Sequence, residues 1–222
     1  TISKKCNLKG NIMSLLYGDD FIDKTDLTGK NYAYYNLFKN CTNIVDVSKL
    51  ILPATTLSSY CYQHMFSGCT GLEKAPELQA ETLSGSCYAY MFSGCSSLTQ
   101  APELPAEKLS TLCYSNMFSG CTRLTQSPVL PATTLVRGCY YYMFQGCTNL
   151  TQAPELPAEK LSTSCYSYMF QGCSNLNYIK MLATNISATG CLINWVDGVA
   201  STGTFVKNPE MKSLQTGVSG IP

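Results

Sequence analysis

Charged residues are scarce in this chain. They make up 13% of its 222 residues, whereas roughly 25% is usual for soluble domains. The 15 lysines and arginines nearly balance the 14 aspartates and glutamates, so the net charge is only +1. Nucleic acids and anionic membranes attract proteins with a clear excess of positive charge, so neither is expected as a partner. The sequence also lacks the apolar run of about 18 residues that a membrane span requires.

Histidine is almost absent, although the chain has 13 cysteines. Zinc sites usually combine cysteine with histidine or contain a CxxC pair, and this sequence has no CxxC and only His64. A serine or cysteine nucleophile needs a neighbouring base, and no phosphate-binding glycine loop is present. The acidic run at 19–26 lacks the glycine and glutamate of an EF-hand loop, which makes a charged loop a better interpretation than a calcium site. We therefore expect no catalysis, no metal and no cofactor.

The dominant feature is an internal repeat. A Met-Phe pair recurs every 26 residues, and a fixed period of this length is typical of a stacked repeat architecture. One unit, residues 150–175, reads LTQAPELPAEKLSTSCYSYMFQGCSN. A unit two residues longer precedes the regular copies, and a decayed unit follows them with Trp195-Val196 in the Met-Phe place. We expect one structural domain, with repeats over residues 32–200 between an N-terminal cap (1–31) and a C-terminal cap (201–222).

Each unit divides into two parts. The segment LTQAPELPA predicts a short extended stretch, because its prolines cannot donate backbone hydrogen bonds to a long strand. After it, apolar residues recur every fourth position from Leu161 to Cys173, and Gly172 lies near the end as a stop, which predicts a short helix. One such unit buries too little apolar surface to fold alone, so the units must stack.

The repeated motifs resemble a known family. MFSGCTGL at 65–72 and MFQGCTNL at 143–150 are similar to the core of the BspA-like, or Treponema pallidum-type, leucine-rich repeat, in the long-period form of gut Bacteroidales. GNIMSLLYGDDF at 10–21 and NWVDGVASTGTFVKNPEM at 194–211 resemble its two caps. The resemblance implies an α/β leucine-rich-repeat solenoid of about six units, each a strand plus a short helix. Relatives usually continue past SGIP with a Gly-Trp segment, so we expect a truncated C-terminal cap.

Most of the cysteines fall into two series with the repeat period. Within a unit the two positions lie eight residues apart, or about 12 Å along a helix, which exceeds the roughly 7 Å limit for a disulfide. We therefore expect them to be small buried residues of a stacked core rather than disulfides. Cys6 stands outside both series and is the best candidate for an exposed thiol.

Two other rows of the repeat are candidate binding surfaces. The first is a row of mainly aromatic side chains, which would suit sugars or proteins if it is exposed. It comprises His64, Tyr90, Asn116, Tyr142 and Tyr168. The alternative for this row is packing between units. An acidic row, interrupted by Val129, comprises Glu77, Glu103 and Glu155. Its alternatives are a solvated, partly compensated face and a site for a cation or basic partner.

The resemblance implies a non-enzymatic binding or adhesion protein, extracellular or on the outer cell surface. Its partner would be a host or bacterial surface protein or a glycan. Two other functions remain open, a phage tail or receptor-binding module and a passive stalk that displays another domain. A scarcity of charge favours contact with neutral partners over electrostatic capture.

Overall fold

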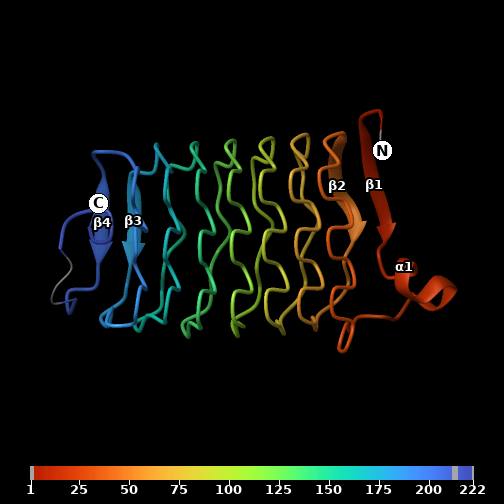
Figure 1. Ribbon diagram of the computed structural model, residues 1–222, viewed down its shortest axis with the longest axis horizontal. Coiled ribbons are helices and arrows are strands. Elements are labelled where there is room, and N and C mark those ends of the chain that lie inside the picture. The colour runs from red at the N-terminus through yellow and green to blue at the C-terminus, as the bar shows by residue number, and fades with distance from the viewer. Residues whose placement is uncertain (1–2, 212–214, 222) are drawn as a thin grey trace.

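The chain is a row of similar coils, stacked from one end of the molecule to the other (Figure 1). The computed structural model describes residues 3–211 and 215–221. Strand β1 (Cys6–Asn11), helix α1 (Ser14–Tyr17) and the 3-10 helix η1 (Gly18–Asp20) lie at the N-terminal end. Strand β2 (Ile44–Ile51) belongs to the first coil, and strands β3 (Tyr178–Met181) and β4 (Thr204–Lys207) lie at the other end. No helix in these described residues is long and apolar enough to cross a membrane.

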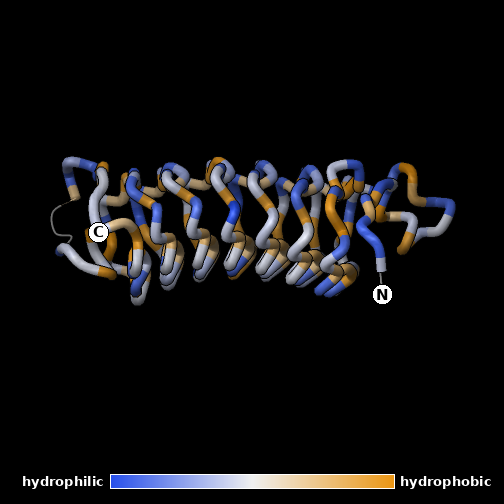
Figure 2. Tube along the Cα trace, turned by 90° about the horizontal axis from the view of Figure 1, so that it is seen from above, coloured by the Kyte–Doolittle hydropathy of each residue, from blue (hydrophilic) through white to orange (hydrophobic). Residues whose placement is uncertain are grey.

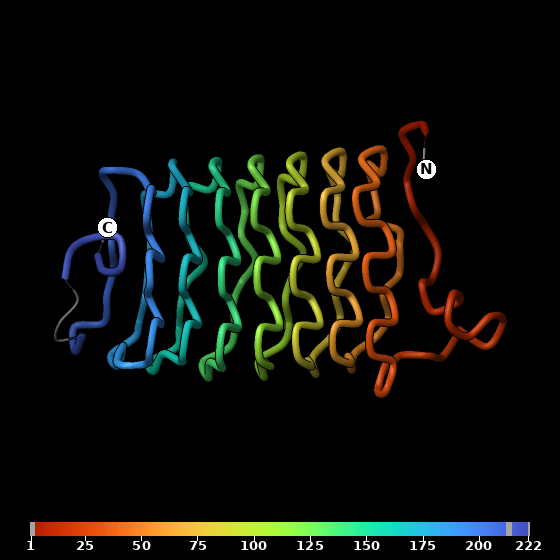
Figure 3. The backbone as a smooth tube through the Cα atoms, viewed as in Figure 1, coloured from red at the N-terminus to blue at the C-terminus, as the bar shows by residue number. Residues whose placement is uncertain are grey.

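The expected helix of each unit is wrong, because a column of consecutive turns takes its place (Figure 3). Around Met65, every second backbone N–H donates to the carbonyl three residues earlier, for example from Met65 to Tyr62 at 3.2 Å. The N–H groups between them donate to the next coil instead, as from Phe66 to the carbonyl of Met91 at 2.9 Å. An α-helix uses its N–H groups internally and would leave none for this ladder. The turns therefore join the coils, which helices could not do.

The turn column has a period of four residues, which explains the apolar step of four in the sequence. Backbone φ is positive at every fourth residue, with +61° at Tyr60, +57° at His64 and +73° at Gly68. The residues after each of these positions point inward, so Cys61 and Met65 are fully buried. A four-residue period and a helical period of 3.6 are hard to distinguish over three turns.

The opposite side of each coil is extended, and proline controls where it forms a regular strand. β1 pairs with β2, and β3 pairs with β4, in parallel register. These four strands contain no proline. The coils between them carry prolines at this place, at positions 76, 102, 128 and 154. There, strand pairing is reduced to single parallel bridges such as Gln100 with Gln126, because proline has no N–H to donate.

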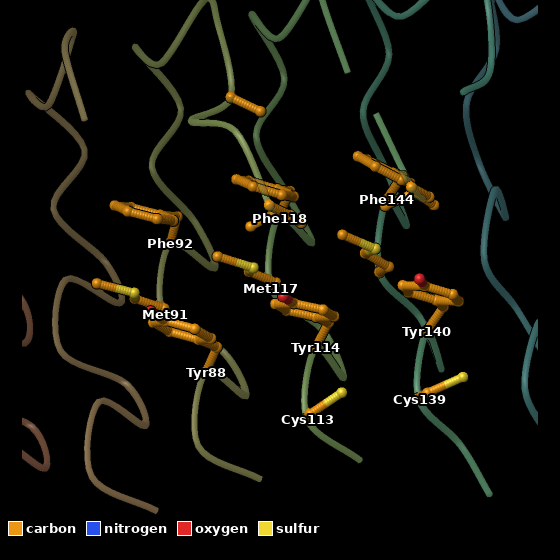
Figure 4. Packing of buried hydrophobic residues seen from close by; sticks show 14 of the residues in the cluster. Tyr88, Met91, Phe92, Cys113, Tyr114, Met117, Phe118, Cys139, Tyr140 and Phe144 are labelled. Carbon is orange, nitrogen blue, oxygen red and sulfur yellow. The ribbon is translucent and has the colours of Figure 1, made fainter. Parts of the chain in front are cut away.

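The core consists of columns of identical side chains along the stack (Figure 4). One column of stacked rings, with centroids 5.4–6.1 Å apart, comprises Tyr34, Tyr62, Tyr88, Tyr114, Tyr140 and Tyr166. A second, with centroids 5.4–5.8 Å apart, comprises Phe38, Phe66, Phe92, Phe118, Phe144 and Phe170. Figure 2, which colours the chain by hydropathy, shows apolar positions repeating from coil to coil. Stacking thus buries residues that a single unit would expose.

Each end of the stack is covered by the chain itself. At the N-terminal end, the Tyr34 hydroxyl donates to the carbonyl of Ile12 at 3.2 Å, and Met13 is fully buried. At the C-terminal end, Trp195 takes the place of the repeat methionine, and its Nε1 donates to the carbonyl of Gly220 at 2.8 Å. These segments shield the apolar ends that an uncapped repeat would expose to water.

Candidate binding surfaces

A shallow groove runs along the extended side of the stack. Two hollows of about 510 and 530 Å³ share Gln100, Ala101 and Glu103. A third, of about 350 Å³, shares Glu77 and Gln79 with its neighbour. The hollows therefore form one continuous feature that crosses successive coils from residues 48–52 to residues 152–155.

The acidic row predicted from the sequence forms one wall of this groove. In each coil the extended segment alternates, so that Glu77 and Gln79 face solvent while Leu78 and Ala80 are buried. The wall comprises Glu77, Glu103, Val129 and Glu155. Val129 is 67% exposed, which leaves an apolar step in an otherwise carboxylate wall. The structure brings the three glutamates together, and their role in binding stays a prediction.

The opposite wall consists mainly of side-chain amides, which the sequence did not lead us to expect as a binding surface. Besides Lys74, it comprises Gln100, Gln126 and Gln152. Their signal was present, since a glutamine precedes the Ala-Pro or Ser-Pro step in these units with the repeat period. The floor between the walls is made of small or cyclic residues, among them Ala75, Ala101 and Pro154.

Lysines lie at both ends of the acidic wall. Lys180 forms an ion pair with Glu155 at 2.9 Å, and Lys49 lines the same hollow as Glu77. Next to the groove, Lys74 pairs with Asp46 at 3.6 Å. Hydrogen bonds from Ser48 lower the pKa of Asp46. Glu77 and Glu103 have no ion-pair partner among the described residues, so they are the available carboxylates of the groove.

The aromatic row lies on the other side of the coil, at the tips of the turns rather than on a helix. All five of its residues have positive φ, between +55° and +59°. His64 stacks on Tyr90 with centroids 4.5 Å apart, and Tyr142 stacks on Tyr168 at 4.3 Å. Asn116 separates the two pairs; it is only 8% exposed and accepts a hydrogen bond from the Ser115 hydroxyl.

Packing between coils determines what this row can offer a ligand. The stacked rings are half-buried, and their faces contact each other. A face used in this way is closed to a sugar ring, which leaves mainly ring edges at the surface. Burial and the neighbouring Tyr141 and Tyr168 raise the pKa of Tyr142 to about 12, so its hydroxyl stays neutral. Binding by this row also stays a prediction.

The turn side carries a further ladder that sequence reasoning missed. Ser119 donates to the side chain of Gln145, which donates to Gln171 at 3.0 Å, and Gln171 donates to Asp197 at 3.0 Å. Each member occupies the same repeat position, which was the available signal. The ladder uses its polar groups internally, so it joins coils rather than presenting a site.

The cysteines of both series are buried in the core, as expected, and all are free thiols. The second series does more than fill space. Each of its thiols donates a hydrogen bond to the backbone carbonyl of the phenylalanine in the preceding coil, at 3.0–3.2 Å. The donors are Cys69, Cys95, Cys121, Cys147 and Cys173. Cys6 is partly buried. No group of three or more histidine, cysteine or acidic side chains within residues 3–211 and 215–221 could hold a metal ion.

The repeats of the chain match a known family. Residues 85–191 match the model described as the BspA type leucine rich repeat region, in six copies. No curated protein matches the sequence. Among solved structures, a leucine-rich repeat protein from Bacteroides ovatus matches with 12% identity over 78% of this chain and 80% of that chain. The TM-score between the two structures is 0.21. Residues 85–191 are therefore a region of BspA-type leucine-rich repeats.

Proposed function

We propose that this protein is a non-catalytic binding or adhesion protein, secreted or displayed on the outer cell surface. Leucine-rich repeat proteins are generally non-enzymatic modules that mediate protein binding, and BspA-type members are typically surface or secreted proteins. The repeat family supports this class of function. The partner would be a host or bacterial surface protein or a glycan.

The observation that carries the proposal is the groove across successive coils. It places polar side chains of the same type in register, with Gln100, Gln126 and Gln152 facing the wall of Glu103 and Glu155. These side chains are exposed, and the hydrogen-bonded stack sets the spacing of the backbone positions that carry them before a ligand arrives. The aromatic row is the competing surface, with part of its ring area already used between coils.

A binding survey with two sets of variants tests the proposal. The wild-type protein is applied to host matrix proteins, bacterial surface fractions and glycan arrays, and binding is compared with Glu103→Ala/Gln126→Ala and with Tyr90→Ala/Tyr142→Ala/Tyr168→Ala. Both altered groove residues are exposed, so thermal unfolding should change little. We expect at least a tenfold loss of binding in the groove variant and little change in the aromatic variant.

Other outcomes would favour other functions. Loss of binding only in the aromatic variant would contradict the groove as the contact surface and support the turn side. Binding only to intact bacterial cells would favour a phage tail or receptor-binding module. The absence of any ligand would contradict the proposal and support a passive stalk.

A further inference from the structure

We propose that the groove binds a neutral, linear polysaccharide that lies along the stack, with one sugar residue on each coil. This inference rests on the proposed function and names the ligand class of the same groove. Four features support it, namely the spacing of the coils, the chemistry of the walls, the balance of charge and the shape of the floor.

The spacing of the coils favours a polymer with a short, regular repeat. Neighbouring coils pair in the manner of parallel strands, which lie about 4.8 Å apart. An extended peptide presents side chains on one face about every 6.7 Å, so it loses register with the coils after two or three contacts. A 1,4-linked pyranose chain advances by nearly the coil spacing with each sugar. In a β-1,4-linked chain successive sugars face opposite ways, so such a chain can place one sugar on every coil and repeat the same contacts on every second coil.

The walls match a ligand that both donates and accepts hydrogen bonds. The side-chain amides of Gln100 and Gln152 can do both, whereas the carboxylate of Glu103 accepts only. Sugar hydroxyls supply the donors that a carboxylate needs, and such charge-assisted hydrogen bonds are about twice as strong as neutral ones. A coil with one amide wall and one carboxylate wall can therefore hold two hydroxyls of one sugar.

The charges of the groove favour a neutral chain over a charged one. An anionic polysaccharide would meet Glu77 and Glu103, which have no ion-pair partner among the described residues. A basic peptide would meet Lys49 and Lys180 at the ends of the acidic wall and Lys74 in the opposite wall. Like charges brought together in this way oppose binding. A neutral ligand avoids both conflicts.

The floor and the length of the groove set the size of the ligand. Ala101 and Ala153 leave room for a ring above the floor and offer it an apolar surface. The hollows extend over successive coils, from residues 48–52 through 74–79, 100–103 and 125–129 to 152–155. At about 4.8 Å per coil, these five segments span about 19 Å between the first and the last. The groove should therefore hold five sugars.

Titration calorimetry with oligosaccharides of increasing length tests the proposal. The probes are β-1,4-linked glucose and mannose oligomers from two to six residues, with hyaluronan fragments of equal length as the anionic comparison. For at least one neutral series, we expect affinity to rise from two to five sugars and to stay level between five and six. Hyaluronan should bind at least tenfold more weakly. Affinity independent of length, or equal affinity for hyaluronan, would overturn the proposal.

Matched variants locate the site. Glu103→Gln keeps the shape and removes the carboxylate, so we expect about a tenfold loss of affinity for the pentasaccharide, as for one charge-assisted hydrogen bond. Glu107→Gln is the same change at an exposed residue of the same coil outside the groove, and it should have no effect. Val129→Glu completes the acidic wall and should raise affinity at least threefold. Equal behaviour of the two Gln variants would contradict a site in the groove.

Removal of one coil provides a second test. Deletion of residues 98–123 removes one repeat period and joins two equivalent positions, so the circular dichroism spectrum and cooperative unfolding should be retained. If they are, the affinity should level off at four sugars instead of five. A folded deletion variant that still binds five sugars more tightly than four would contradict the proposal.

The outcome for the ligand class is separate from that for the proposed function. If a protein from the binding survey binds the groove and no neutral oligosaccharide does, the polysaccharide assignment is wrong and the binding function stands. If no ligand of any class binds, both proposals fall.

Discussion

At the scale of single residues, the turn columns depend on backbone conformations that most residues avoid. Thirteen non-glycine residues of the described chain have positive φ, and all of them lie in these columns. Left-handed backbone destabilises a non-glycine residue by roughly 1–2 kcal/mol. The ladder compensates for this, because each coil adds several backbone hydrogen bonds to its neighbour, each worth about 1 kcal/mol. The strain is therefore tolerated only in the stack.

Two glycines that differ in surroundings should differ in their tolerance of alanine. A Cβ at Gly146 would lie 3.9 Å from the Gly120 Cα, which is an ordinary contact. Gly146→Ala should therefore lower the free energy of unfolding by only about 1 kcal/mol, because alanine is disfavoured at the φ of +70°. A Cβ at Gly71 would lie 2.3 Å from the Thr42 carbonyl oxygen, which belongs to the backbone of the preceding coil.

Gly71→Ala should therefore destabilise the protein by more than about 2 kcal/mol, because the two coils must separate locally. Urea unfolding of both variants measures the difference. Equal stabilities would contradict the close approach of the two backbones.

Thiol reactivity should follow burial. Burial raises the pKa of Cys121 and Cys139 to about 12, so these thiols form almost no reactive thiolate near neutral pH. Cys6 and Cys41 are only partly buried.

We expect a disulfide reagent at pH 8 to modify at most these two residues quickly in the native protein. All 13 thiols should react after unfolding without a reductant. A clearly lower total in the unfolded protein would show that disulfides had formed. This shielding would also let thiols persist outside the cell.

At the scale of elements, the turn column and the extended segment have different tasks. The turn column carries the coil-to-coil ladder and the stacked rings, so its side chains are largely used within the protein. The extended segment makes fewer backbone pairs because of its prolines, and its outward side chains line the groove. Surface that is not used between coils is therefore concentrated on the extended side.

The C-terminal cap should depend on one side chain. Trp195 is fully buried and donates from Nε1 to the Gly220 carbonyl. Trp195→Phe removes this hydrogen bond and part of the buried volume, so we expect a loss of about 2 kcal/mol. Hydrogen exchange should increase around residues 215–221.

Phe144→Leu in a central coil is the control for this change. It should lower stability as well, but it should leave the exchange rates of the cap unchanged, because coils contact only their neighbours. Equal acceleration of cap exchange in both variants would argue against a local role for Trp195.

At the scale of the whole molecule, stability should fall steeply in alkali. Burial raises the pKa of Cys61, Cys121 and Cys139 to about 12, whereas an unfolded cysteine titrates near 8.5. The folded state therefore keeps these thiols protonated up to a higher pH than the unfolded state does. The resulting stability is fully present below about pH 8.5 and is lost as the pH rises towards 12.

Within that window, each such thiol lowers the free energy of unfolding by about 1.4 kcal/mol for every pH unit of increase. Three thiols together lower it by about 4 kcal/mol per pH unit. Urea midpoints measured between pH 7 and 11 should be level at first and then drop. Replacement of Cys61 and Cys139 by alanine should make the drop shallower. A midpoint that stays level to pH 10.5 would contradict the burial of these thiols as protonated groups.

Much of this architecture could be predicted from the sequence alone. The 26-residue period determined that the chain stacks, and the spacing within a unit determined that Cys61, Met65 and their equivalents are buried. The prolines determined that regular strands are short. The period also placed Glu77, Glu103 and Glu155 in one row.

Only the tertiary structure decided that the apolar step of four belongs to turns. The choice depends on where the backbone N–H groups donate, and half of their acceptors lie 25 residues further along the chain, as Met91 does for Phe66. A pattern within one unit contains no information about an acceptor in the next unit. For the same reason, stacking alone turned the faces of Tyr142 and Tyr168 towards each other and joined the hollows of successive coils into one groove. A repeat period specifies which residues are equivalent, whereas the packing of one coil on the next decides which of their atoms remain available to a ligand.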